Sequence, residues 1–292
     1  MGKPHILLTN DDGIHARGLQ VLEQALRETG RYRLTVVAPS DQQSASSHSL
    51  TLTTPVRVLE LGEGRHAVTG TPTDCVLVAI EHILRDDRPN FVVSGINHGP
   101  NMGEDVTYSG TVAAAMEGAI LGIPSYALSL AAWHPRDWSG AAAFVRERLP
   151  EILARPLGLG ALLNINFPER PAAEWRGVRV ARLGSRVYHD VITQQVDPRG
   201  RPFLWISGHG PTWAADPDTD FALSQQGYVV VTPLKIDLTH HELLQRLSGL
   251  EHDGPPGAAA EPRDGEAPDR PGTRPEAEAG DAAVRRGREA RP

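Results

Sequence analysis

The chain has 292 residues, 40% of them apolar, and carries a net charge of −7. This length allows one large domain or two small ones, with enough apolar residues for a real hydrophobic core. The negative charge excludes a broad basic footprint for nucleic acid, so no nucleic acid duplex is expected as a partner.

The cysteine content and the hydropathy of the chain indicate where in the cell the protein is located. The single cysteine, Cys75, cannot form an intrachain disulfide and fits a reducing compartment. The sequence shows no charged-then-apolar leader, and no apolar run approaches the roughly 20 residues that span a bilayer. We therefore predict a cytoplasmic protein without membrane contact.

Helical and extended patterns alternate along most of the chain. Apolar residues at helical spacing, such as Leu19, Leu22 and Leu26, predict helices, and short apolar runs predict strands. The predicted strands are 6–9, 34–38, 66–69, 91–94, 125–129, 162–167 and 228–233. The predicted helices are 18–28, 74–85, 111–121, 141–154 and 238–247. This rhythm predicts an α/β fold with a parallel sheet covered by helices on both faces.

The segment at about 178–233 breaks this rhythm. Asp197-Pro198-Arg199-Gly200 is typical of a hairpin turn, and an apolar run follows at 203–206. Two extended arms joined by such a turn could project from the core. Their apolar residues would then be buried against another subunit.

Composition changes sharply after Leu250. Residues 251–292 contain no Leu, Ile or aromatic residue, so they cannot bury enough surface to offset their ordering entropy. We predict one folded domain over 1–250 and a disordered tail over 251–292.

Two adjacent carboxylates, Asp11 and Asp12, follow the first predicted strand, and Gly13 allows a sharp turn after them. In an open parallel sheet the functional crevice lies at the carboxyl ends of the strands. Neighbouring anions are tolerable there if a cation neutralises them, and hard oxygen ligands favour Mg²⁺, Mn²⁺ or Ca²⁺. A helix cap would explain one carboxylate and leave the other. The pair therefore predicts a metal site and chemistry on phosphate.

Two further polar loops follow predicted strands. The stretch from Ser94 to Asn101 contains Asn97, whose amide oxygen could complete a site begun by two carboxylates. In the hydroxyl-rich loop at 39–48, a hydroxyl could supply another metal oxygen and His48 could meet the substrate. Gly, Pro and Asn also build plain turns, and the 39–48 loop is equally typical of a solvated segment.

Tyr108-Ser109-Gly110-Thr111 opens the predicted helix at 111–121. Backbone N–H groups and hydroxyls at a helix N-terminus form an anion site. A plain N-cap role for Ser109 or Thr111 is compatible with anion binding, so this signal is weak by itself.

Taken together, these stretches resemble the SurE (survival protein E) family of metal-dependent nucleotidases. The resemblance covers about residues 3–247. It rests on the ordered segments 7–13, 37–44, 70–75, 94–101, 108–118, 163–168, 197–202 and 220–234.

The resemblance implies a Rossmann-like three-layer fold and hydrolysis of nucleoside 5′-monophosphates to nucleoside and phosphate. Some members also act on 3′-nucleotides and short polyphosphate. It further implies one Mg²⁺ or Mn²⁺ per subunit, and a homodimer or homotetramer with an exchanged C-terminal arm. The implied metal ligands are Asp11, Asp12, Ser44 and Asn97.

On this interpretation Asp11 and Asp12 are also the catalytic residues, with water as the nucleophile. The residues expected to hold the phosphate oxygens are Asn101, Ser109, Gly110 and Thr111. Many relatives carry Pro where this chain has Arg17, which is either solvated or brings a cation near the pocket mouth.

Three alternatives stay open at this point. A covalent aspartyl-phosphate route usually needs Asp-x-Asp spacing, whereas these carboxylates are adjacent. A receiver-like switch module needs a phosphate-accepting Asp where this chain has Asn97. A nucleotide-binding protein without hydrolysis would be expected to carry one of the glycine fingerprints, which are absent from the sequence.

Overall fold

A computed structural model describes residues 2–187, 192–206, 212–213 and 216–250. The predicted tail at 251–292 lies outside the described residues. Among the helices of the described ranges, none is both long enough and apolar enough to cross a bilayer.

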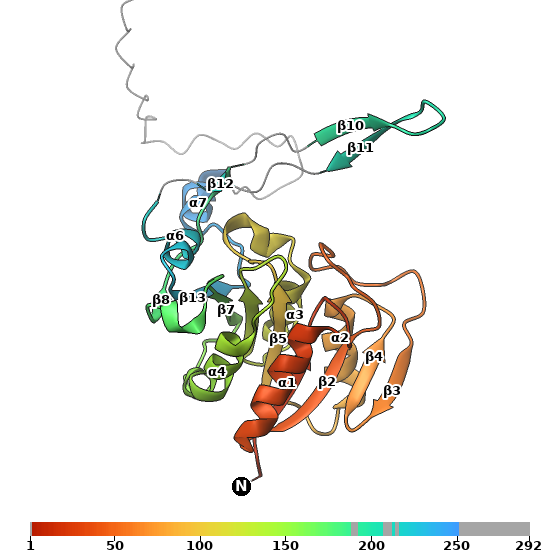
Figure 1. The fold of residues 1–292 in the computed structure, drawn as a ribbon, viewed down its shortest axis with the longest axis vertical. Helices are drawn as coiled ribbons and strands as arrows, with labels where there is room; N and C mark the ends of the chain where they lie inside the picture. Colours follow the sequence, from red (N-terminus) through yellow and green to blue (C-terminus); the bar gives the residue numbers. More distant parts are fainter. Residues whose placement is uncertain (1, 188–191, 207–211, 214–215, 251–292) are drawn as a thin grey trace, which may run out of the picture. The chain divides into compact units, whose positions relative to one another are not determined.

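A nine-stranded sheet, in the order β3-β4-β2-β1-β5-β6-β7-β13-β8, forms the centre of the fold (Figure 1). Its strands are β1 His5–Thr9, β2 Arg33–Pro39, β3 Val58–Gly62, β4 Arg65–Val68, β5 Phe91–His98, β6 Ser125–Leu130, β7 Ala161–Phe167, β8 Val178–Val180 and β13 Val229–Lys235. The neighbours from β4 to β7 are all parallel. Only the β3–β4 and β13–β7 pairs within this sheet are antiparallel. The predicted, mostly parallel sheet is confirmed.

Helices cover both faces of the sheet, because alternate strand residues point to opposite sides. Ile6 and Leu8 of β1 pack in the core cluster with α1 (Arg17–Thr29) and α4 (Ser139–Glu147). Leu7, between them, packs in the cluster that contains α2. On that same side α3 contacts α2. The bounds of these two helices are Pro72–Val78 for α2 and Gly110–Ile120 for α3. The arrangement is the three-layer α/β fold that the sequence predicted.

Several element boundaries differ from the prediction. The helix predicted over 74–85 begins earlier, at Pro72, because Thr71 forms a capping box with Asp74. It continues as the π-helical turn η1, Ala79–Ile83. The helix predicted over 141–154 divides into α4 and α5 (Leu149–Leu153), where Pro150 cannot donate a backbone hydrogen bond. The edge strands β3 and β8 were not predicted.

The remaining described elements lie mostly in the last third of the chain. Their bounds are η2 Gly103–Thr107, η3 Ala172–Glu174, β9 Arg186–Val187, β12 Thr212–Trp213, α6 Asp220–Gln225, α7 His241–Arg246 and η4 Ser248–Leu250. Contacts divide the chain after Leu238, so α7 and η4 belong to a separate unit. The helix predicted over 238–247 is confirmed only over its central part.

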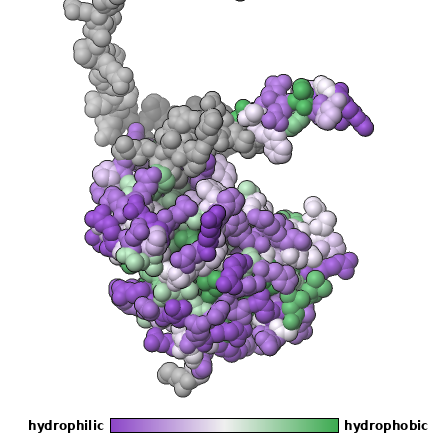
Figure 2. All heavy atoms as spheres, in the orientation of Figure 1, coloured by the Kyte–Doolittle hydropathy of each residue, from purple (hydrophilic) through white to green (hydrophobic). Residues whose placement is uncertain are grey.

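The predicted hairpin is present as β10 (Ile192–Val196) paired antiparallel with β11 (Pro202–Ile206). Its turn is closed by the Asp197 N–H, which donates to the Arg201 carbonyl over 2.9 Å. Apolar side chains are exposed along both strands, including Leu204 at 60% and Trp205 at 57%. Figure 2 shows hydrophobic residues among the hydrophilic ones on this hairpin. Several exposed apolar side chains gathered on one hairpin fit a surface that meets a partner.

Candidate functional site

The candidate site lies where the order of the strands reverses. From β1 the chain moves to β2 on one side of the sheet, and it later returns to β5 on the other side of β1. The loops after β1 and β5 therefore leave the same carboxyl edge side by side, and Thr9 pairs with Ser94 at this edge. Ligands of doubly wound sheets bind in the crevice at such a reversal.

Asp11 lies against the start of α3. Its Oδ1 accepts a short hydrogen bond from the Thr111 hydroxyl, and both side chains are buried. A Cβ on Gly110 would lie 2.7 Å from the Asp11 Cβ, so only glycine allows this approach. Burial raises the pKa of Asp11 to about 6, and the neighbouring Asp12 charge adds to the shift. The structure thus brings the acidic pair and the predicted phosphate-binding turn together.

Asp12 faces the carboxyl end of β5. His98 Nδ1 lies 2.9 Å from Asp12 Oδ1, at the distance of an ion pair, but the two atoms form no hydrogen bond. Asp12 Oδ1 is buried and accepts no hydrogen bond from the described residues. The adjacent Asn97 donates its amide N–H to the Gly99 carbonyl over 3.0 Å, which leaves its amide oxygen out of that bond.

Backbone hydrogen bonds bring the loop after β2 to the same edge. The Gln43 N–H donates to the Asp11 carbonyl over 2.7 Å. Ser44, the next residue, is exposed, and its hydroxyl accepts a hydrogen bond from Gln42 Nε2 over 2.9 Å. Ser47 donates its backbone N–H to the Tyr108 carbonyl, 3.2 Å away, which ties this loop to the turn before α3.

Asn101 has a structural environment that the sequence did not reveal. It is buried, and its side-chain amide donates to Ser129 Oγ over 2.8 Å. Its carbonyl accepts hydrogen bonds from the amides of Asn164 and Asn166 on β7. These bonds fix the loop after β5 against the sheet, so Asn101 has a scaffold role whether or not it also meets phosphate.

Ser109 caps α3, because its hydroxyl accepts the Val112 N–H over 3.1 Å. His48, in the loop after β2, contacts the same helix further along, where its Nε2 lies 2.8 Å from Glu117 Oε2. Glu117 is seven residues after Gly110, which corresponds to about 10 Å along an α-helix. The structure therefore holds His48 at Glu117, two turns away from the predicted phosphate-binding turn.

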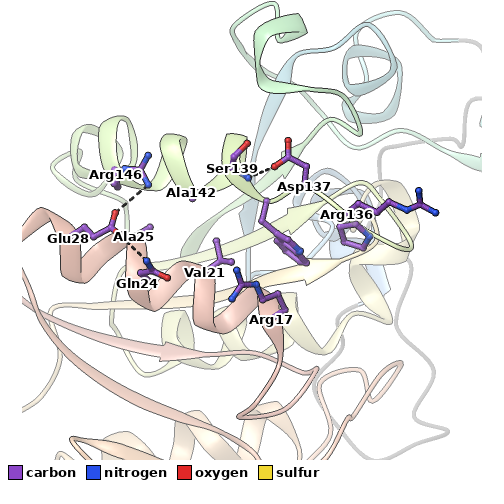
Figure 3. A pocket seen from close by; sticks show the side chains of 12 residues that line it. Arg17, Val21, Gln24, Ala25, Glu28, Arg136, Asp137, Ser139, Ala142 and Arg146 are labelled. Atoms are coloured by element: carbon purple, nitrogen blue, oxygen red, sulfur yellow. Dashed lines mark hydrogen bonds and ion pairs between the residues drawn. The ribbon is translucent and has the colours of Figure 1, made fainter.

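Arg17 lines a different cavity, of about 530 Å³, between α1 and α4 (Figure 3). Arg146 of α4 lies at the other end of this cavity, paired with Glu28 over 3.4 Å. The first turn of α1 packs tightly on β5, since a Cβ on Gly18 would overlap the Ile96 carbonyl. Arg17 itself is exposed, and both interpretations of this residue stay open.

Three contact partners of the predicted elements were not predicted from the sequence: His98 beside Asp12, Glu117 beside His48, and Gly18 against Ile96 of β5. His98 offered a signal, because it directly follows Asn97 in a loop already singled out. Glu117 and Gly18 gave none, since their partners are 69 and 78 residues away in the sequence.

The sequence was compared with protein-family models and with known proteins. The sequence model described as Survival protein SurE matches residues 6–190 of the chain. The chain belongs to the SurE family. A relative from Gemmatimonas aurantiaca named 5′-nucleotidase SurE is 53% identical over 245 residues, which is 82% of this chain and 95% of that protein. A Vibrio cholerae protein of the same name is 45% identical, over 84% of this chain and 92% of its own length.

A solved structure supports the fold of this SurE family member. The crystal structure of the SurE protein from Aquifex aeolicus matches with a TM-score of 0.75 at 38% sequence identity. The match covers 85% of this chain and all of that chain. The family identified from the sequence motifs is therefore confirmed, and so is its fold.

Proposed function

We propose that this chain is a divalent-metal-dependent 5′-nucleotidase, which hydrolyses nucleoside 5′-monophosphates to nucleoside and phosphate. Phosphomonoesterase activity is supported by family membership and by relatives named 5′-nucleotidase SurE at 45–53% identity. The observation that carries the metal dependence is the buried acidic pair at the strand reversal, with Asp12 Oδ1 free of hydrogen bonds from described residues.

The donor set fits a hard cation. Carboxylate, hydroxyl and amide oxygens are the ligands that Mg²⁺ and Mn²⁺ prefer. In the described part of the chain no group of three or more His, Cys, Asp or Glu side chains is placed to hold a metal. A metal would therefore depend on two carboxylates and neutral oxygens. The proposed ligands are Asp11, Asp12, Ser44 and Asn97.

A bound divalent cation would supply Lewis-acid polarisation of the phosphate and would lower the pKa of a water molecule. Thr111 fixes Asp11 by donating to one carboxylate oxygen, which leaves the other free to act. The N-terminus of α3 would bind phosphate oxygens through the backbone N–H groups of Gly110 and Thr111. Ser109 caps this helix and so holds that turn in place.

Additional substrates, further substrate contacts, assembly and location are proposed from the sequence. We propose 3′-nucleotides and short polyphosphate as additional substrates, and Asn101 as a residue near the phosphate. A substrate contact of His48 would require it to leave Glu117 or to meet a part of the nucleotide far from phosphorus. The exposed apolar hairpin supports a homodimer or homotetramer, and the lone Cys75 supports a cytoplasmic location.

The test is phosphate release from a panel of nucleoside 5′- and 3′-monophosphates and tripolyphosphate, with Mg²⁺, Mn²⁺ or Co²⁺ and with EDTA as control. We expect Asp11→Asn and Asp12→Asn to lose Mn²⁺ binding and activity together, by at least about 100-fold in kcat/KM. Asp86→Asn, an exposed carboxylate before β5, is the matched control and should resemble wild type.

Three outcomes would contradict the proposal. Full turnover in the presence of EDTA would show that the reaction does not require a metal ion. An acid-stable phosphoenzyme on Asp11 or Asp12 would favour the covalent route. Stable phosphorylation by acetyl phosphate without turnover would favour a switch module.

A further inference from the structure

The hydroxyl of Ser46 has no assigned role and lies beside the proposed phosphate-binding turn. Its Oγ is buried and makes no hydrogen bond with any described residue. A buried hydroxyl without a partner is costly, and each such group in a native structure needs an explanation. Since none of the described residues satisfies it, a bound ligand or water is a candidate for its partner.

The position of this hydroxyl is defined by Gly110. A Cβ placed on Gly110 would lie 2.9 Å from Ser46 Oγ and 3.0 Å from Asp11 Oδ2. Both oxygens therefore lie close to the backbone of Gly110, the first residue of α3. This residue lies at the helix N-terminus, where backbone N–H groups and the helix dipole favour an anion.

The backbone around Ser46 is constrained in a way that is unusual for non-glycine residues. Ala45 and Ser47 adopt φ angles of 58° and 54°, in the left-handed region that L-residues rarely occupy. Ser47 holds this conformation through its hydroxyl, which donates to the Thr107 carbonyl over 2.7 Å. The Ser46 N–H donates to the Gln43 carbonyl over 3.2 Å, next to the bond that Gln43 makes to Asp11. Ser46 is therefore fixed on the loop that carries Ser44.

We propose that Ser46 is a phosphate ligand, whose hydroxyl donates a hydrogen bond to a non-bridging oxygen of the substrate monoester and of the phosphate product. This inference rests on the proposed function, because it assigns a further residue to that same site. Ser46 differs in role from Ser44, which we propose as a metal ligand. The Ser46 hydroxyl, for which the described residues supply no partner, gains one when the phosphate is bound.

The test is Ser46→Ala, measured by kcat/KM for a nucleoside monophosphate and by the inhibition constant of inorganic phosphate. A hydrogen bond to a charged group predicts a fall in kcat/KM of roughly 10- to 100-fold, with a similar rise in the inhibition constant. The affinity for Mn²⁺ should stay within about twofold of wild type. The melting temperature should not fall, because the variant removes an unsatisfied buried group.

Two comparison variants separate this role from a structural one. Ser44→Ala should weaken Mn²⁺ binding, which Ser46→Ala should not. Ser40→Ala removes a hydroxyl of the same loop that bonds Asp41 instead, and it should leave the phosphate inhibition constant unchanged.

The inference is overturned if Ser46→Ala leaves both phosphate inhibition and kcat/KM within twofold of wild type. It is also overturned if activity falls only in step with the melting temperature. Failure of the proposed function would look different, because the wild-type protein would then release no phosphate from any monoester. In that case calorimetric titration with inorganic phosphate would still compare the wild type and Ser46→Ala directly.

Discussion

At the scale of single residues, the candidate site depends on a close approach between Asp11 and Gly110. Thr111 binds one oxygen of Asp11, and the missing side chain of Gly110 leaves room beside the other. A buried carboxylate, a helix N-terminus and a hydroxyl that no described residue satisfies therefore lie close together. The geometry is specific, because any larger residue at position 110 would displace the carboxylate.

Gly110→Ala tests this approach. The added methyl would lie 2.7 Å from the Asp11 Cβ and 2.9 Å from Ser46 Oγ, so Asp11 must shift. We expect kcat/KM to fall by about 100-fold, since misplacement of a catalytic group by about 1 Å has an effect of this size. Gly158→Ala, where the new Cβ meets no atom within 4 Å, is the control and should keep full activity. Unchanged activity of Gly110→Ala would show that the approach has no functional role.

At the scale of elements, strands β1 and β2 are joined at their amino ends by buried polar contacts. His5 is buried, its Nε2 lies 2.9 Å from Thr35 Oγ1, and Arg33 donates to its Nδ1 over 3.0 Å. Because Nδ1 accepts a hydrogen bond, the ring is neutral with its proton on Nε2. Burial, followed by the charge of Arg33, lowers the pKa of His5.

This contact predicts a pH dependence of stability. A lowered pKa in the folded state means that the unfolded chain binds the proton more readily. The contribution of His5 is therefore fully present above the unfolded pKa of 6.5 and is lost as pH falls through the lower folded value. Chemical denaturation between pH 7.5 and pH 5 should show a steeper loss in wild type than in His5→Gln.

His82→Gln replaces an exposed histidine of η1 and is the control for this experiment. It should keep the wild-type slope of unfolding free energy against pH. Equal slopes for wild type and His5→Gln would mean that the buried histidine takes up its proton without cost.

At the scale of the whole molecule, the two-stranded arm carries more exposed apolar surface than its own pairing can bury. Ile192, Val196, Leu204 and Trp205 are each more than half exposed. Exposed apolar surface of this kind marks interaction sites, and a second copy of the chain is the partner that we propose.

The double variant Leu204→Ser/Trp205→Ser tests this assembly. The loss of two large apolar groups should weaken a subunit interface, so light scattering after gel filtration should give a lower mass than for wild type. Gln194→Ser on the neighbouring strand is the control and should keep the wild-type mass. A wild-type protein that elutes as a monomer would contradict the role of the arm.

Sequence patterns alone determined most of the architecture. Apolar runs followed by polar turns revealed the parallel strands, and the turn at 197–200 revealed the hairpin. The segments that carry Asp11, Asp12 and Asn97 could be predicted to leave the sheet at one edge, because parallel strands share one carboxyl edge. The motif resemblance then identified the family, which the comparisons confirm.

Only the tertiary structure decided how individual side chains are used. The side-chain amide of Asn101 donates to Ser129, and His48 lies against Glu117, and the sequence indicated neither contact. The buried hydroxyl of Ser46 could not be distinguished from its serine neighbours in the sequence. The physical reason is that the partners in these contacts are 28 and 69 residues apart along the chain. The periodicity of the sequence indicates only which face of a helix or strand a residue occupies.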